Sequence, residues 1–201
     1  SGSQKVVPAT IEFIDIAGLV AGASKGEGLG NKFLANIREV SAIVHMVRCF
    51  DDDNIVHVDG SVDPVRDIDI INTELLLADI EQVQKAIDNQ KRKVKSNQKD
   101  EAARLDVLIK CNDAFGQGNG LRHMDLSDDE QSLIKEYNFL TGKKMIYCCN
   151  VSESDLESGG NAHVEAVRQS VADEDAGVVV LSANLEHELS SLSDDEKTEY
   201  L

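Results

Sequence analysis

Two residues near the start of the chain have the type and spacing for nucleotide chemistry. Asp15 ends a short apolar run that begins at Ile11, and Gly18 follows three positions later. The run predicts a buried strand. An Asp at the carboxyl end of such a strand can face the Mg²⁺ of a bound nucleotide, and a glycine lets its backbone N–H approach a terminal phosphate. Alone this pattern is weak, because an Asp-containing turn after a strand is common in α/β proteins.

Two later strands also end in polar residues. Residues 144–149 predict a strand that ends at Asn150-Val151-Ser152-Glu153, and residues 177–181 predict another that ends at Ser182-Ala183. Residues 42–48 predict a further buried strand, preceded by a helix from about Asn31. A strand–helix–strand unit of this length implies parallel pairing, so the candidate residues should meet at one edge of a sheet.

A helical segment separates the strand at 42–48 from the strand at 144–149. Alternating spacings of three and four residues predict a coiled-coil seam, with Gln90 in one seam position. The apolar members of this seam are Leu76, Ile80, Val83, Ile87 and Val94. A second amphipathic helix follows the turn at 96–98, so the two should form an antiparallel hairpin. Residues Ser127 to Glu130 match a capping box that begins another helix.

The charge is unevenly distributed. The chain of 201 residues has a net charge of −17, which argues against DNA and membrane surfaces as partners of the whole molecule. No apolar run approaches the ~20 residues of a membrane span. The expected end of the hairpin nevertheless has only basic charges, which predicts either a solvated helix end or a docking surface for RNA or an acidic partner. These basic residues are Lys91, Arg92, Lys93, Lys95 and Lys99.

The three strand ends together resemble a known family. They read D-I-A-G, N-V-S-E and S-A, the order in which translation-factor-type GTPases place their metal and γ-phosphate switch, base-recognition loop and base-supporting loop. With the glycine-rich run 22–30 and the Arg48-Cys49-Phe50 segment, the chain closely resembles the Obg-like ATPase family, the YchF-type branch of the Obg GTPases. The resemblance extends from about Val6 to the C-terminus.

The resemblance implies an α/β fold: a partial P-loop NTPase domain (G-domain) with a mostly parallel sheet and an inserted antiparallel coiled-coil hairpin. The expected domains are residues 4–62 with 141–201 for the G-domain and 63–140 for the insertion. It implies that Asp15 faces Mg²⁺ through water, and that a second set of residues contacts the nucleotide. That set is Gly18, Asn150, Val151, Glu153, Ser182 and Ala183.

Two departures from ordinary GTPases have chemical meaning. Leu19 stands where a Gln orients the attacking water, and the resemblance offers His57 as the catalytic substitute. Glu153 stands where guanine recognition uses Asp, and its extra methylene misplaces the acceptor for guanine N1 and N2. Val151 lacks the Lys stem that packs over the base. ATP is therefore the expected ligand, with GTP weaker.

The sequence contains no G-x-x-x-x-G-K-[ST] stretch to hold the α- and β-phosphates. We therefore expect this chain to be a fragment, inactive alone, of a cytoplasmic ATPase whose P-loop and TGS domain lie outside it. The resemblance implies the ribosome, or a ribosomal subunit, as partner. An alternative is a non-catalytic module that docks through its hairpin and uses nucleotide only to set conformation. A strict GTPase is a weaker third interpretation, which Glu153 argues against.

Overall fold

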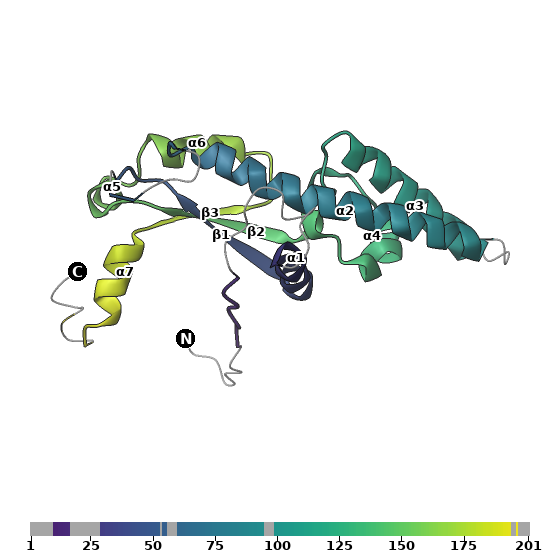
Figure 1. The fold of residues 1–201 in the computed structure, drawn as a ribbon, viewed down its shortest axis with the longest axis horizontal. Helices are drawn as coiled ribbons and strands as arrows, with labels where there is room; N and C mark the ends of the chain where they lie inside the picture. Colours follow the sequence, from purple (N-terminus) through teal and green to yellow (C-terminus); the bar gives the residue numbers. More distant parts are fainter. Residues whose placement is uncertain are drawn as a thin grey trace, which may run out of the picture.

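The computed structural model describes residues 10–16, 29–52, 54–55, 60–94, 99–193 and 196. Helices precede, separate and follow the described strands, and the longest helical stretch stands between β1 and β2 (Figure 1). Their bounds are α1 Leu29–Glu39, β1 Ala42–Arg48, α2 Pro64–Val94, α3 Lys99–Gly116, η1 Leu121–His123, α4 Asp128–Ile134, η2 Lys135–Tyr137, η3 Leu140–Gly142, β2 Lys144–Asn150, α5 Glu153–Glu157, α6 Ala162–Ser170, β3 Gly177–Leu181 and α7 Ala183–Ser190.

The described strands form one parallel sheet in the order β1-β2-β3. Arg48 of β1 pairs with Asn150 of β2, which in turn pairs with Leu181 of β3, so the three carboxyl ends are level. The α/β class and the parallel pairing that the sequence predicted are therefore confirmed. The loop after β2, predicted from the sequence to be the base-recognition loop, and the loop after β3, predicted to be the base-supporting loop, leave the same edge of the sheet.

The main core covers one face of this sheet. Tyr147, Cys149 and Val47 point into it and are almost fully buried, and α6 contributes Val164 and Val167. In Figure 1, α6 and the beginning of α2 lie along this face. Because both faces of these strands carry apolar side chains, each strand is a nearly continuous apolar run, which explains why all three were recognisable from sequence.

The opposite face of the sheet is partly exposed. Its apolar side chains are Val44 and Met46 of β1, Ile146 of β2 and Val179 of β3, which are 38 to 53 % exposed. The register places Val44 beside Ile146, so these side chains form one apolar patch rather than isolated residues. Patches of this kind usually mark a contact surface.

The hairpin of α2 and α3 projects beyond the amino ends of the strands, away from the base loops (Figure 1). A second apolar cluster holds its two helices together, including Val83 and Ile87 from α2 and Leu108 and Phe115 from α3. Gln90 is 1 % exposed, and its amide donates to the backbone oxygen of Glu101 at 3.0 Å. The antiparallel hairpin and the buried place of Gln90 in its seam are confirmed.

Helix starts follow local chemistry. Pro64 begins α2, where the missing N–H costs no hydrogen bond, and Asp63 accepts from the backbone N–H of Arg66 at 3.1 Å. Ser127 and Glu130 form the expected capping box of α4, with bonds of 2.8 and 3.3 Å. Both signals depend only on neighbouring residues, and the capping box of α4 was for this reason predictable from the sequence.

The strand predicted for Ile11 to Asp15 is wrong. Residues 10–16 form no strand, and Ile11 and Phe13 are 77 % and 81 % exposed. A strand needs a hydrogen-bonded neighbour, and the only described partner of β1 is β2. Strand propensity without a paired edge is a weak preference. Ile16 alone packs inward, against the cluster of α1 and α2 that includes Leu34 and Leu75.

The four cysteines are buried and free. Within the described part of the chain, no helix has both the length and the apolar character needed to cross a bilayer.

Candidate nucleotide-base site

Asn150 organises the carboxyl edge of the sheet. Its side-chain oxygen accepts a hydrogen bond from the backbone N–H of Ala183 at 2.9 Å, and its backbone oxygen accepts from the N–H of Cys49 at 2.8 Å. One residue thus joins the ends of all three strands. Because the amide oxygen is already bonded, the NH₂ group is the part of Asn150 available to donate to a ligand.

Val151 fixes the backbone next to Asn150. It is 2 % exposed, and its N–H donates to the oxygen of Leu181 at 2.9 Å. Ser152 then caps α5 by accepting from the N–H of Asp155 at 3.2 Å. The base-recognition loop therefore has a defined backbone even though it lies at the surface.

Glu153 is held by the base-supporting loop. Its carboxylate accepts from the side-chain amide of Asn184 at 2.8 Å, and the same amide lies 3.3 Å from a carboxylate oxygen of Glu188. Ser182, which is 1 % exposed, caps α7 by accepting from the N–H of Leu185 at 3.4 Å. The side chain of Glu153 is thus directed toward α7.

Asn161 is a supporting residue that sequence reasoning missed. Its amide donates to the backbone oxygen of Cys49 at 2.7 Å and to the carboxylate of Asp155 at 2.8 Å, and its oxygen caps α6 at Val164. The hydrogen bond from Asn161, with a further one from Ser152, lowers the pKa of Asp155. Asn161 thereby fastens α5 and α6 to the end of β1. An N-cap Asn before a helical run is the only sequence signal for it.

Arg48 shapes the loop after β1. Its guanidinium donates to the backbone oxygens of Phe50 at 3.1 Å and Ile55 at 3.0 Å, and it lies 4.8 Å from the centre of the Phe50 ring. This segment leads toward His57. His57 itself lies outside the described residues, as do Gly18 and the glycine-rich residues up to 28.

The structure brings together five of the predicted site residues, namely Asn150, Val151, Glu153, Ser182 and Ala183. Asp15 is exposed, and among the described residues no hydrogen bond or ion pair joins it to this group. No cluster of three or more metal-ligating side chains occurs in the described ranges. A single carboxylate such as Asp15 still suits Mg²⁺, which usually keeps several waters beside one or two protein carboxylates.

The basic residues are at the other end of the molecule. Lys91, Arg92 and Lys93 are exposed in the last turn of α2, and Lys99 begins α3. Lys95 lies outside the described residues. The sheet separates this end of the hairpin from the base loops (Figure 1).

Curated proteins similar to this chain match almost all of it. The chain is 49 % identical over 198 residues to the ribosome-binding ATPase YchF of Pasteurella multocida, 47 % to that of Escherichia coli O157:H7, and 45 % over 199 residues to that of Bacillus subtilis. Each match covers 98 % of this chain and 54 % of the relative, so the chain spans about half the length of the curated relatives it matches. No family model matches it.

A solved structure has the same fold. The Schizosaccharomyces pombe YchF GTPase is 34 % identical, with a TM-score of 0.76 over 92 % of this chain and 51 % of that one. The parallel sheet, its base loops and the inserted hairpin define a G-domain type of α/β protein. Over the region that it covers, the chain belongs to the YchF branch of the Obg-like family.

Proposed function

We propose that this chain is part of an ATP-hydrolysing molecular switch that acts with the ribosome. The observation that carries the proposal is the convergence of Asn150, Val151 and Ala183 at one edge of a parallel sheet, with an amide NH₂ group free to contact a base. The names of the relatives, ribosome-binding ATPase and GTPase, support both the reaction and the partner. We place the protein in the cytoplasm on the same grounds.

In this proposal adenine is preferred because Glu153 cannot serve as the guanine acceptor. Guanine presents two donors, N1–H and N2–H, to one carboxylate. Glu153 is a methylene longer than Asp and its carboxylate is bonded to Asn184. The NH₂ of Asn150 and the backbone around Val151 remain to contact the base. Loss of a paired polar contact can change selectivity by about 10⁴-fold, so weaker GTP binding is expected.

The phosphate end of the proposed site needs residues beyond this sequence. Asp15 would hold Mg²⁺, Gly18 would approach the γ-phosphate, and a P-loop would come from the part of the relatives that this chain does not cover. Mg²⁺ would neutralise the charge that develops on the phosphates. His57 would position the attacking water, since Leu19 has no polar group. We retain residues 4–62 with 141–201 as the nucleotide domain and 63–140 as the insertion.

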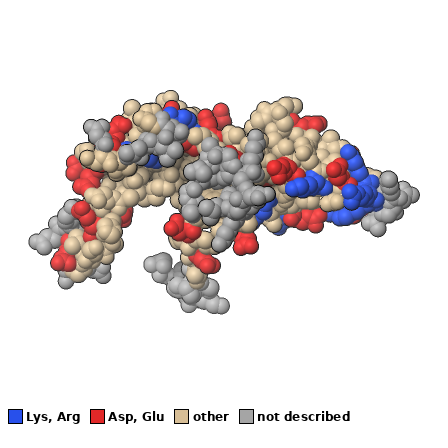
Figure 2. Space-filling model, in the orientation of Figure 1, with Lys and Arg blue, Asp and Glu red and all other residues tan. Residues whose placement is uncertain are grey.

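A second candidate function is a docking module in which nucleotide only sets conformation. Lys and Arg side chains gather at the free end of the hairpin, whereas acidic residues are spread over the rest of the visible face (Figure 2). This segregation favours contact with RNA phosphates or an acidic surface. Both candidates place Lys91, Arg92, Lys93, Lys95 and Lys99 at the partner interface. Only the enzyme requires His57.

A calorimetric titration tests the proposal. Mg-ATP and Mg-GTP are titrated into the 201-residue chain and into a longer form that includes the preceding segment of the relatives. We expect binding by the longer form alone, with ATP tighter than GTP. Binding by the short chain would mean that its own residues bind the phosphates, and equal affinities would refute the role given to Glu153. Absence of binding by both forms would refute the nucleotide site itself.

A further inference from the structure

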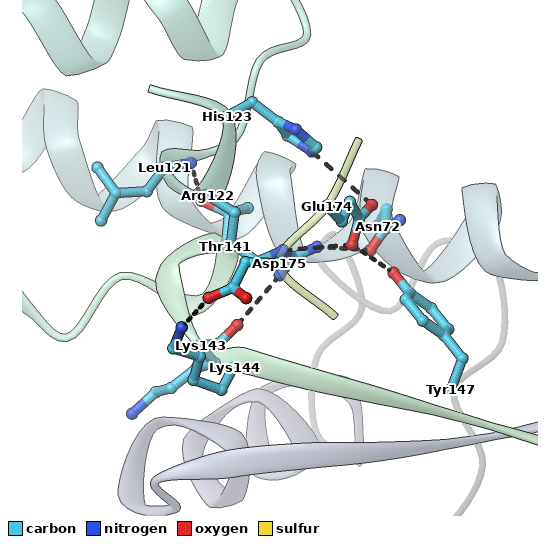
Figure 3. A network of polar contacts seen from close by, with 10 residues as sticks. All are labelled: Asn72, Leu121, Arg122, His123, Thr141, Lys143, Lys144, Tyr147, Glu174 and Asp175. Atoms are coloured by element: carbon cyan, nitrogen blue, oxygen red, sulfur yellow. Dashed lines mark hydrogen bonds and ion pairs between the residues drawn. The ribbon is translucent and has the colours of Figure 1, made fainter. Parts of the chain in front are cut away.

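A buried carboxylate joins the sheet to the hairpin. The side chain of Glu174, in the segment before β3, is 8 % exposed. It accepts a hydrogen bond from the hydroxyl of Tyr147 on β2 at 2.9 Å and lies 3.7 Å from Nε of Arg122 on η1. His123 places its Nε2 atom 3.8 Å from the other carboxylate oxygen and is charged only when protonated. Figure 3 shows these groups converging on Glu174.

Arg122 extends this network to α2. Its guanidinium donates to the side-chain oxygen of Asn72 at 3.2 Å and reaches the backbone oxygen of Lys143 at 3.5 Å. Asn72 is also near enough to Tyr147 to oppose part of the rise in its pKa. Burial, with the nearby charge of Glu174, raises the pKa of Tyr147 to about 12, which keeps its hydroxyl proton in place as a donor. Side chains from α2, η1, β2 and the segment before β3 thus meet at one point.

The apolar contact between α2 and the sheet is small by comparison. Among the described buried residues of the sheet core, α2 contributes only Ile68. Its next buried apolar residues, Leu75 and Ala78, pack in a separate cluster with α1, Leu140 and the partly buried Ile43 of β1. The rest of its buried surface faces α3 and the helices that follow. Polar contacts therefore make up a large part of the attachment of α2 to the sheet, and beside the Glu174 network they include the hydrogen bonds that Asp79 receives from Leu140 and Thr141.

We propose that the Glu174 network is a lock that fixes the orientation of the hairpin relative to the sheet. Tyr147 and Glu174 lie on, or just before, the two strands whose carboxyl ends form the base loops. Asn72 belongs to α2, whose last turn contains basic residues, and Arg122 belongs to η1, which follows α3. One carboxylate therefore ties the strands of the base loops to the hairpin. Neutralising or releasing it allows α2 and the hairpin to rock as a lever.

The lever multiplies a small rotation. Asn89 is exposed near the free end of α2, about 17 residues beyond Asn72. At a rise of about 1.5 Å per residue, the two lie about 26 Å apart along the helix. A rotation of about 10° at Asn72 therefore moves Asn89 by about 4 Å. A displacement of this size is measurable by pulsed electron paramagnetic resonance between two spin labels.

The test places labels at Asn89→Cys and at Glu165→Cys on α6, which is bound to the sheet through Val164 and Val167. The four native cysteines are buried, so the labels react at the introduced positions. With Glu174→Gln we expect the distance distribution to broaden or shift by about 4 Å or more. Asp175→Asn is the matched control, because Asp175 is the neighbouring acid, is 91 % exposed and, among the described residues, forms an ion pair with Lys144 alone. It should leave the distribution unchanged.

Tyr147→Phe is a second variant that keeps the buried ring and removes only the hydroxyl. It should broaden the distance distribution less than Glu174→Gln does. If Glu174→Gln does not fold, the distance distribution of Tyr147→Phe serves as the test of the lock. A distribution identical to that of Asp175→Asn in every folded lock variant would overturn the proposal. The measurement involves no nucleotide, so its outcome is independent of the proposed ATPase activity.

Discussion

Asp79 is the buried charge whose replacement gives the sharpest test of how the hairpin is held in place. It is fully buried on α2 and receives three hydrogen bonds: from the N–H of Leu140 at 2.9 Å and from the N–H and the hydroxyl of Thr141 at 2.8 Å each. Burial raises the pKa of Asp79, and the bonds from Thr141 and Leu140 oppose that rise. Because all three donors point at its two oxygens, the ionised carboxylate is the form that this geometry binds.

Asp79→Asn keeps the size of the side chain but offers one acceptor oxygen instead of two. Either orientation of the amide places its NH₂ group against a backbone N–H, of Leu140 or of Thr141. One buried N–H without a partner costs about 1–3 kcal/mol. The remaining bonds lose the charge of their acceptor, and charge-assisted bonds are roughly twice as strong as neutral ones. We therefore expect the free energy of unfolding to fall by about 2–4 kcal/mol.

Urea unfolding followed by circular dichroism measures this loss, provided that the slope of the unfolding free energy against urea concentration is the same in both proteins. The matched control is Asp88→Asn, which alters an exposed aspartate on the same helix and should change the free energy of unfolding by less than about 0.5 kcal/mol. If Asp79→Asn were as stable as Asp88→Asn, the carboxyl group would be neutral in the folded protein. The reasoning from its three donors would then be refuted.

Four further predictions concern pH, catalysis, partner binding and base choice. Burial lowers the pKa of His45 from 6.5 to about 4. As the pH falls, the unfolded chain therefore protonates His45 before the folded protein does. Stability should fall by up to about 3 kcal/mol as the pH drops from 6.5 to 4, and unfolding curves for His45→Leu should lack most of this slope. In the longer nucleotide-binding form, His57→Ala should reduce ATP turnover at least about tenfold without changing the Kd for ATP; unchanged turnover would exclude the histidine from the mechanism. Changing Lys91, Arg92 and Lys93 together to Glu should weaken ribosome co-sedimentation and flatten its salt dependence, whereas equal binding at low salt would make these residues a solvated helix end. Glu153→Asp should raise the affinity for GTP relative to ATP by about tenfold or more, with Glu157→Asp on the same helix as the control; an unchanged ratio would contradict the proposed base contact.

The strands and the hairpin were predictable because their signals are local. Residues 42–48, 144–149 and 177–181 are apolar runs bounded by polar residues, and each forms a strand within a residue of the expected bounds. The 3/4 spacing from Leu76 to Val94 and the pattern from Ser127 to Glu130 describe contacts between near neighbours. The side that Gln90 faces also follows from its place in that spacing.

The run from Ile11 to Asp15 shows where this reasoning fails. Its composition suits a strand, but a strand is defined by the hydrogen bonds of a neighbour, and composition does not supply one. Asp15 was accordingly expected at a strand end and is found exposed in a segment without strand structure. The supporting role of Asn161 was likewise hidden, since it contacts Cys49, 112 residues away in sequence.

The sequence by itself determined the order of elements, the hairpin and the identity of the residues at the strand ends, because period and residue type depend on the chain alone. Only the tertiary structure decided which of these residues meet. Asn150 reaches Ala183, Glu153 reaches Asn184, and Glu174 collects Tyr147, Arg122 and His123. The physical reason is that the way the elements pack, rather than distance along the chain, sets which partner a polar side chain can reach, and a buried side chain such as Glu174 needs one.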